Sequence, residues 1–252
     1  MYVFKKDFVD ENTNSYCGKK KLSSGTAYFL RDYNGNIRFA GKKCAEKCAT
    51  NNLKQIPDFT KSLISRREGQ ANGGGTAYSN NSLNDFSKAD AITYIVLREE
   101  KLSEYEINGK GLSYEVLKEY YEQYKRDSDL SDQAVAHILK IESNVSIKNK
   151  RLSLINLSTC YAYQFILERT IVALTKNNNV SGVSFVKDLL HGESGLKLYC
   201  SLTKKQINSL SKMLQFLPGD LKEAKLRCFD LWDTMQGISI NKIIENYESK
   251  PF

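Results

Sequence analysis

The chain has 252 residues and a formal net charge of +8, with 41% hydrophobic and 26% charged residues. This composition excludes an intrinsically disordered chain, and the length can bury a hydrophobic core in one large domain or two modest ones. No apolar run reaches the roughly 18 residues that cross a bilayer, and the opening MYVFKKDFVDE lacks the layout of a signal peptide. We therefore expect a soluble, cytoplasmic protein.

Positive charge is concentrated in the first quarter of the chain. Residues 1–67 contain 14 Lys and Arg against 6 Asp and Glu, whereas the remainder contains 23 of each kind. This asymmetry favours a polyanionic partner for the first quarter, because lysines near phosphates release condensed counterions on binding. The alternative is a basic surface that only keeps the protein soluble.

Turn chemistry predicts a small β module at the start of the chain. Residues 1–10 mix aromatic and β-branched side chains with lysines, which favours a short edge strand. The stretches 26–32 and 36–41 flank an Asn34-Gly35 pair, which predicts a hairpin with a type I′ turn. Residues 42–56 are expected to form a helix with Cys44 and Cys48 one turn apart, and a further short helix is expected after Pro57.

Loop, hairpin and cysteine-bearing helix together give residues 14–48 a resemblance to the treble-clef type of zinc module, as in small proteins of phages and mobile elements. In that module a zinc knuckle precedes the hairpin, and the start of the helix supplies the remaining ligands. The resemblance makes Cys17, Cys44 and Cys48 the candidate metal ligands and zinc the candidate cofactor.

The ligand set is one residue short of the pattern. Asn14 stands where a Cys-x-x-Cys knuckle has its first cysteine, and both histidines lie far away in the sequence. A carboxylate such as Asp7 or Asp10 can complete a four-ligand site. Alternatively, the module keeps its fold by apolar packing, with a helical cysteine facing the core.

Cations in and around this stretch are the candidate nucleic-acid contacts. Three precede the hairpin, two lie near its tip and three lie at the start of the helix: Lys19, Lys20, Lys21, Arg31, Arg38, Lys42, Lys43 and Lys47. Tyr28, Phe29, Tyr33 and Phe39 interleave with them. A basic surface with exposed aromatic rings can hold a nucleic-acid backbone and stack on bases, although strand alternation sends only half of the rings outward.

Composition changes beyond this module. Residues 1–67 are expected to form the basic module, residues 68–85 a Gly, Asn and Ser linker, and residues 86–252 a mainly α-helical domain, which gives an α+β protein. Predicted helices at 87–106, 112–127 and 130–143 are followed by a second set at 158–177, 183–192 and 202–217, which can be interpreted as an internal duplication. A last amphipathic helix is expected over 220–235, with Trp232 in the core. Cys160, Cys200 and Cys228 are interpreted as small buried residues.

No complete catalytic set is present in the sequence. The two histidines, His137 and His191, have no identifiable catalytic partners. Asp90, Glu99 and Lys101 resemble the acidic pair plus lysine with which many DNA-cleaving enzymes hold Mg²⁺, but helical charge pairing in this stretch disfavours the strand on which those enzymes place the triplet.

We therefore expect a non-enzymatic protein that binds DNA or RNA through its basic N-terminal module, while the helical domain contacts a protein partner or self-associates. The first alternative is a helical protein-interaction module, such as an inhibitor or adaptor. A Mg²⁺-dependent nuclease is the second.

Overall fold

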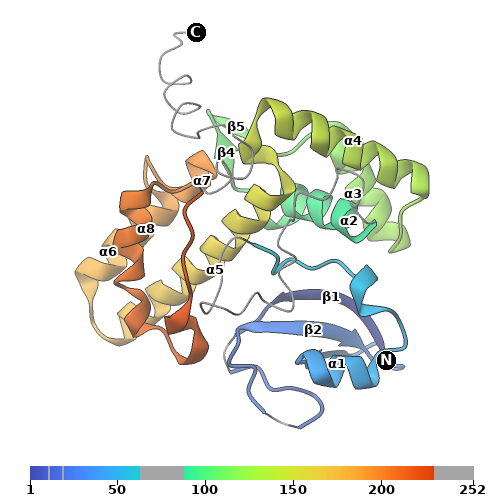
Figure 1. Ribbon diagram of the computed structural model, residues 1–252, viewed down its shortest axis with the longest axis horizontal. Helices are drawn as coiled ribbons and strands as arrows, with labels where there is room; N and C mark the ends of the chain where they lie inside the picture. Colours follow the sequence, from blue (N-terminus) through green and yellow to red (C-terminus); the bar gives the residue numbers. More distant parts are fainter. Residues whose placement is uncertain (11, 19, 63–87, 230–252) are drawn as a thin grey trace.

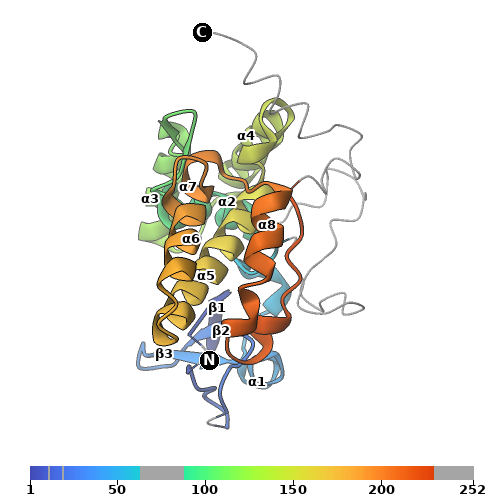
Figure 2. The same cartoon turned by 90° about the vertical axis from the view of Figure 1, so that its left-hand side faces the viewer.

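A computed structural model of the chain describes residues 1–10, 12–18, 20–62 and 88–229. The predicted linker at 68–85, Lys19, Trp232 and the end of the last predicted helix lie outside the described residues. The described part is an α+β fold, as predicted, with a small N-terminal sheet beside a larger helical body (Figures 1 and 2).

The N-terminal sheet has three antiparallel strands in the order β1-β2-β3: β1 (Tyr2–Phe8), β2 (Thr26–Arg31) and β3 (Ile37–Ala40). β1 is an edge strand of this sheet, as predicted. Its free edge is partly covered, because the Lys6 backbone N–H donates to Pro57 O (2.9 Å) and its carbonyl accepts from Phe59 N (3.0 Å). This pairing draws residues 57–59 into an extended path, so the helix predicted after Pro57 is absent through residue 62.

The β2–β3 hairpin is confirmed, but its predicted turn type is wrong. A type I′ turn needs positive φ at both central residues. Gly35 has φ +82°, whereas Asn34 is not among the described residues with positive φ. Asp32 builds a longer loop instead, since its Oδ1 accepts the backbone N–H groups of Asn34 (3.0 Å) and Asn36 (2.8 Å). These local side-chain hydrogen bonds stabilise the longer loop in place of a two-residue turn. Tyr33 lies at the tip of this hairpin loop.

Helix α1 (Lys42–Cys48) is shorter than the predicted 42–56. The chain leaves the helix because Asn51 pairs with the backbone of β1, accepting from Val3 N (2.9 Å) and donating to Val3 O (2.8 Å). A single 3₁₀ turn, Leu53–Gln55, follows. α1 covers one face of the sheet and buries Ala45 against Leu30.

The helical body begins with α2 (Lys88–Val96), which continues into a π-helical turn at Leu97–Lys101. A small hairpin, β4 (Glu106–Ile107) and β5 (Lys110–Gly111), follows and was not predicted. Its turn residues Asn108 and Gly109 have φ +55° and +70°, so the Asn-Gly signal for a type I′ turn is realised here. Two helices complete this part, α3 (Glu115–Asp127) and α4 (Asp132–Lys148).

Helix α5 (Leu154–Lys176) is the centre of the body (Figure 1). Its buried residues occupy most of its circumference, because α2, α6 (Val180–His191) and several turns pack around it. α7 (Leu196–Tyr199) and α8 (Lys204–Ser211) follow, and α8 begins with the predicted Thr203–Gln206 capping box.

The two helix sets differ in helix lengths, and β4–β5 belongs to the first set alone, so the internal duplication stays a prediction. The helix predicted over 220–235 is wrong over its described part. Gly219–Glu223 forms a 3₁₀ turn after Pro218, and residues 224–229 form no helix. Gly219, the first residue of this turn, has φ +57°, a conformation outside the range of a right-handed α-helix.

The sheet packs on the helical body through the end of β1. The Phe8 ring stacks on Phe165 of α5 with centroids 4.6 Å apart and meets Tyr161 edge-on at 5.5 Å. Arg169 of α5 also bonds Asp10 at 2.6 Å. None of the helices in the described ranges has the combination of length and apolar character that a membrane span requires.

Candidate thiol cluster and basic surface

A tight loop presents Cys17 to helix α1. Residues 13–22 fold back on themselves, with Leu22 N donating to Thr13 O (2.8 Å) and Ser15 N donating to Lys20 O (2.8 Å). Tyr16 N donates to Phe39 O (2.7 Å), which attaches the loop to β3. We call residues 13–22 the knuckle loop.

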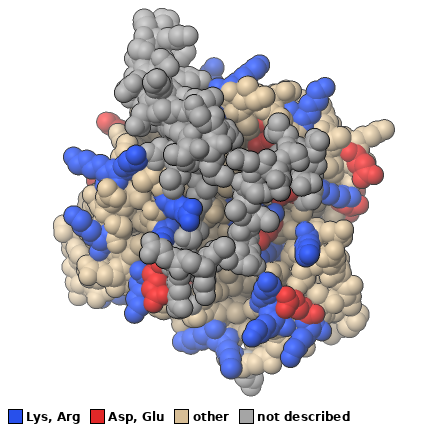
Figure 3. All heavy atoms as spheres, viewed as in Figure 1, with Lys and Arg blue, Asp and Glu red and all other residues tan. Residues whose placement is uncertain are grey.

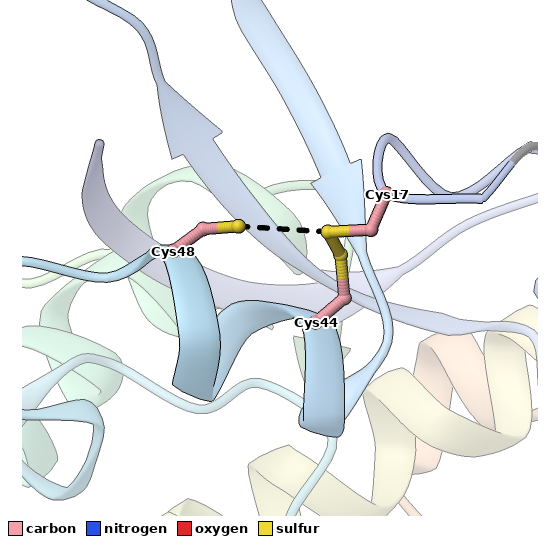
Figure 4. Close-up of a disulfide and its surroundings, with 3 residues drawn as sticks. All are labelled: Cys17, Cys44 and Cys48. Carbon is pink, nitrogen blue, oxygen red and sulfur yellow. Dashed lines mark hydrogen bonds between the residues drawn. A yellow bond between two sulfur atoms is a disulfide. The ribbon is translucent and has the colours of Figure 1, made fainter.

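Three sulfur atoms meet where the knuckle loop touches α1 (Figure 4). Cys44 and Cys48 are four residues apart and share one face of α1, as predicted. Cys17 forms a disulfide with Cys44, and its Sγ lies 3.5 Å from the Sγ of Cys48. All three sulfurs lie within 4.8 Å of one another, and no other group of three or more candidate metal ligands is found among the described residues. The sequence therefore identified the three residues that the fold brings together.

The predicted fourth ligand is wrong. Asp7 lies at the junction with the helical body, where its carboxylate accepts from Lys5 Nζ (2.9 Å) and Tyr161 OH (3.1 Å). Asp10 pairs with Arg169 on α5. In the described part of the chain, no His, Asp or Glu joins the three cysteines.

The three cysteines can either bind a metal ion as thiolates or keep two of their sulfurs in a disulfide. As thiolates they are the soft ligands that zinc selects. As drawn, two of them are joined, and Cys48 remains a half-buried thiol beside the disulfide. Metal binding and the disulfide are alternative ways to fasten the knuckle loop to α1.

No family model, curated protein or solved structure matches the chain.

All the described candidate cations are exposed. They come from the knuckle loop, the hairpin and α1: Lys20, Lys21, Arg31, Arg38, Lys42, Lys43 and Lys47. Lys54, which sequence reasoning did not single out, is exposed as well. In Figure 3, Lys and Arg side chains cover the lower part of the molecule, where Figure 1 shows α1 and the sheet, and others are spread over the rest of this face.

The carboxylates of the same module are mostly withdrawn from the surface. Of the Asp and Glu residues in the described part of residues 1–62, only Asp10 and Glu46 are exposed. Asp7 is 3% exposed, and Asp58 is half-buried against Lys6 Nζ at 3.1 Å. Asp32 organises the hairpin loop. The ratio of cations to carboxylates is therefore higher on the surface of this module than in its sequence.

Strand alternation sends Tyr28 to one face of the sheet and Phe29 and Phe39 to the other, but both faces are covered and none of these three rings is exposed. Phe29 and Phe39 are half-buried and meet edge-on with centroids 5.0 Å apart, while Tyr28 packs against the cluster under α1. Tyr33, in contrast, is 93% exposed, and Tyr16 of the knuckle loop is 48% exposed. Tyr16 was not among the predicted aromatic candidates.

A buried polar network joins the module to the body, and sequence reasoning missed it. Asp7 faces Lys5, Tyr161 and, at 3.7 Å, Lys101, whose Nζ also lies 2.9 Å from Glu100. Burial alone would lower the pKa of Lys101, but Glu100 and Asp7 together raise it above its ordinary value, so this lysine stays charged. The available signal was an acidic residue in a strand whose other residues are aromatic, valine or lysine.

The residues of the Mg²⁺ hypothesis have three separate sets of partners. Asp90 pairs with Lys61 (3.1 Å), and Glu99 accepts from Ser113 Oγ (2.5 Å) near the start of α3. Lys101 faces Asp7. All three lie on α2 or its π-helical turn rather than on a strand, so the structure gives the nuclease hypothesis no support.

Neither histidine lies in a recognisable catalytic group. His137 Nδ1 is 2.8 Å from Tyr120 OH on an exposed face, and His191 ends α6. Cys160 and Cys200 are buried, as predicted, and Cys228 is half-buried.

Proposed function

We propose that the N-terminal module binds nucleic acid through its exposed cations. The observation that carries the proposal is the sorting of charge by the fold: eight described cations of the module are exposed, whereas most of its described carboxylates are turned inward or held in turns. Such a surface attracts phosphates and releases their condensed counterions. The helical body, whose sequence has no excess of positive charge, serves as the base on which the module is held.

Zinc, in this proposal, is the ion that the three cysteines hold in their reduced form. Three of the four ligands of a structural zinc site are present, since three thiols converge from two segments and thiolate is the ligand that such zinc prefers. Cys17, Cys44 and Cys48 would together lock the knuckle loop to α1. This lock matters for binding, because Lys20 and Lys21 are on the loop, and Lys43 and Lys47 are on the helix.

The order of knuckle loop, hairpin and helix, with sulfur atoms at the junction, supports the treble-clef resemblance within this proposal. The module departs from that pattern at Asn14, whose backbone pairs with Lys21 in the knuckle loop. Zinc sites with three protein ligands keep one coordination position open.

Charge reversal on α1 tests the proposal. The double variant Lys43→Glu/Lys47→Glu is compared with Lys118→Glu/Lys140→Glu, which changes two exposed lysines of the helical body by the same total charge. The full chain is used, because β1 packs against α5. Binding of a labelled oligonucleotide at low ionic strength is measured by fluorescence anisotropy, and thermal unfolding checks that each variant is folded.

We expect the α1 variant to bind at least about 10-fold more weakly and the control to change by less than about 2-fold, since only α1 lies close to phosphates. Equal losses in both variants would show that net charge alone matters. Unchanged binding by the α1 variant would favour the protein-interaction alternative, in which the basic module only improves solubility.

A further inference from the structure

Two exposed aromatic rings accompany the cations of the N-terminal module. Tyr33 stands at the tip of the β2–β3 hairpin with 93% of its surface exposed, and Tyr16 lies in the knuckle loop with 48% exposed. The module does have a place to bury rings, because Phe29 and Phe39 pack on the sheet. The two tyrosines are left outside it.

Arg38 links the hairpin to the knuckle loop. Its guanidinium lies over the Tyr16 ring, with Cζ 5.7 Å from the ring centroid, and its Nε lies 3.5 Å from Asp32 at the base of the hairpin loop. Arg38 therefore lies beside Tyr16, and its partner Asp32 directly precedes Tyr33 in the hairpin loop, while Cys17 directly follows Tyr16. The thiol cluster fixes the knuckle loop and thereby positions the Tyr16 ring.

Exposed rings beside cations distinguish between the two forms of nucleic acid. In a duplex the base faces are already stacked, and inserting a side chain costs the unstacking of a step. In a single strand the base faces are free, and an aromatic side chain can stack on any base while nearby cations hold the backbone. Two exposed rings, one of them beside an arginine, therefore favour unpaired bases over a duplex.

We propose that the module takes single-stranded nucleic acid, with Tyr33 and Tyr16 stacking on bases and Arg38 beside Tyr16. This inference rests on the proposed function, since it names the class of nucleic acid that the basic surface binds. Binding of a single strand is not sequence-specific in this arrangement, because every base has a stacking face.

The test compares one sequence in three forms: single-stranded DNA, single-stranded RNA and the DNA duplex. The full chain carries Tyr33→Ala, Tyr16→Ala or Tyr33→Phe, and Tyr114→Ala is the matched control, since Tyr114 is 46% exposed on the helical body. Affinities are measured by fluorescence anisotropy at one low ionic strength. Tyr33 is almost fully exposed, so its replacement leaves the fold intact.

We expect both single strands to bind more tightly than the duplex. Tyr33→Ala should weaken single-strand binding by about 5- to 100-fold and duplex binding by less than about 2-fold, whereas Tyr33→Phe and Tyr114→Ala should bind like the wild type. Equal affinity for the single strands and the duplex, or equal effects of Tyr33→Ala on them, would overturn this inference and leave the proposed function standing. Absence of binding to all three forms would overturn both.

Discussion

Asp7 is the residue that most directly couples the sequence of β1 to the helical body. It is 3% exposed and bonds Lys5 Nζ, Tyr161 OH and the Phe8 backbone N–H at 2.8–3.1 Å. A buried carboxylate needs such partners, because its desolvation is otherwise uncompensated. Asp7 therefore holds the basic module on α5 together with the Phe8 ring contacts and the Asp10–Arg169 ion pair.

Asp7→Asn should destabilise the protein by about 3 kcal/mol, because Lys5 and Lys101 lose the buried partner of their charges. Asp10→Asn is the control. It removes an ion pair to Arg169 that is partly exposed, and it should cost less than about 1 kcal/mol. Urea unfolding measures both through the transition midpoint. Similar costs for the two variants would contradict the role given to Asp7.

Part of the candidate site was predictable residue by residue. Residue types and spacing identified the three cysteines and the candidate cations, because a four-residue helical spacing and a run of lysines are local features. Two partners of Asp7, Lys101 and Tyr161, come from segments more than 90 residues away, and no local pattern indicates them. The hairpin loop was missed in detail because the Asp32 side chain, rather than the Asn34-Gly35 pair, decides its geometry.

Among the elements, β1 and the loop before β2 form the contact between the module and α5. Gly25 lies in that loop with φ +64°, and a Cβ built on it would stand 3.3 Å from the Phe165 ring. Glycine is needed there for two reasons, the left-handed backbone and the close approach of the ring. Both reasons belong to the packing of the module on the body.

Gly25→Ala should therefore destabilise the protein more than Gly35→Ala does. Gly35 also has positive φ, +82°, but nothing lies within 4 Å of its added Cβ, so only the strain of about 1–2 kcal/mol applies there. At Gly25 the crowding against Phe165 should add about 1 kcal/mol or more. Urea unfolding of both variants checks the difference. Equal destabilisation of the two variants would show that the Phe165 ring can move away from the added methyl group without any loss of stability.

Helix α1 and the knuckle loop form the second pair of elements, and zinc binding tests their junction. The reduced full chain should bind one zinc ion, and Cys44→Ser or Cys48→Ser should abolish stable binding, because each removes one of three thiolates. Cys228→Ser is the control outside the cluster. Native mass spectrometry gives the metal content of each variant. No bound zinc, or equal zinc in all four proteins, would contradict the metal site.

Most elements were predictable, and the errors share a cause. Helices with strong caps and periodicity were found, such as α8 with its Thr203–Gln206 box. α1 was predicted too long because Asn51 bonds to Val3 across the fold, and β4–β5 was missed although Asn108-Gly109 was its signal. Tertiary hydrogen bonds decide where an element ends, and a single sequence does not display them.

At the scale of the whole molecule, the charge asymmetry of the sequence becomes a spatial one. The excess of Lys and Arg in residues 1–67 is displayed on one module, and the described carboxylates of that module mostly serve its own fold. Composition indicated the excess charge. The structure adds that the predicted cations it describes are exposed, and that five of them lie on the knuckle loop and α1, the two segments that meet at the three sulfurs.

The dependence of binding on salt tests this account most directly. Phosphate contacts release counterions, so the logarithm of the association constant should fall linearly with the logarithm of salt concentration, by about 0.7 per contact for a single strand. For the full chain we predict a slope of about −3 or steeper with a single-stranded oligonucleotide, reduced in magnitude by about 1 in Lys43→Glu/Lys47→Glu. A flat slope, or no binding at low salt, would contradict the account.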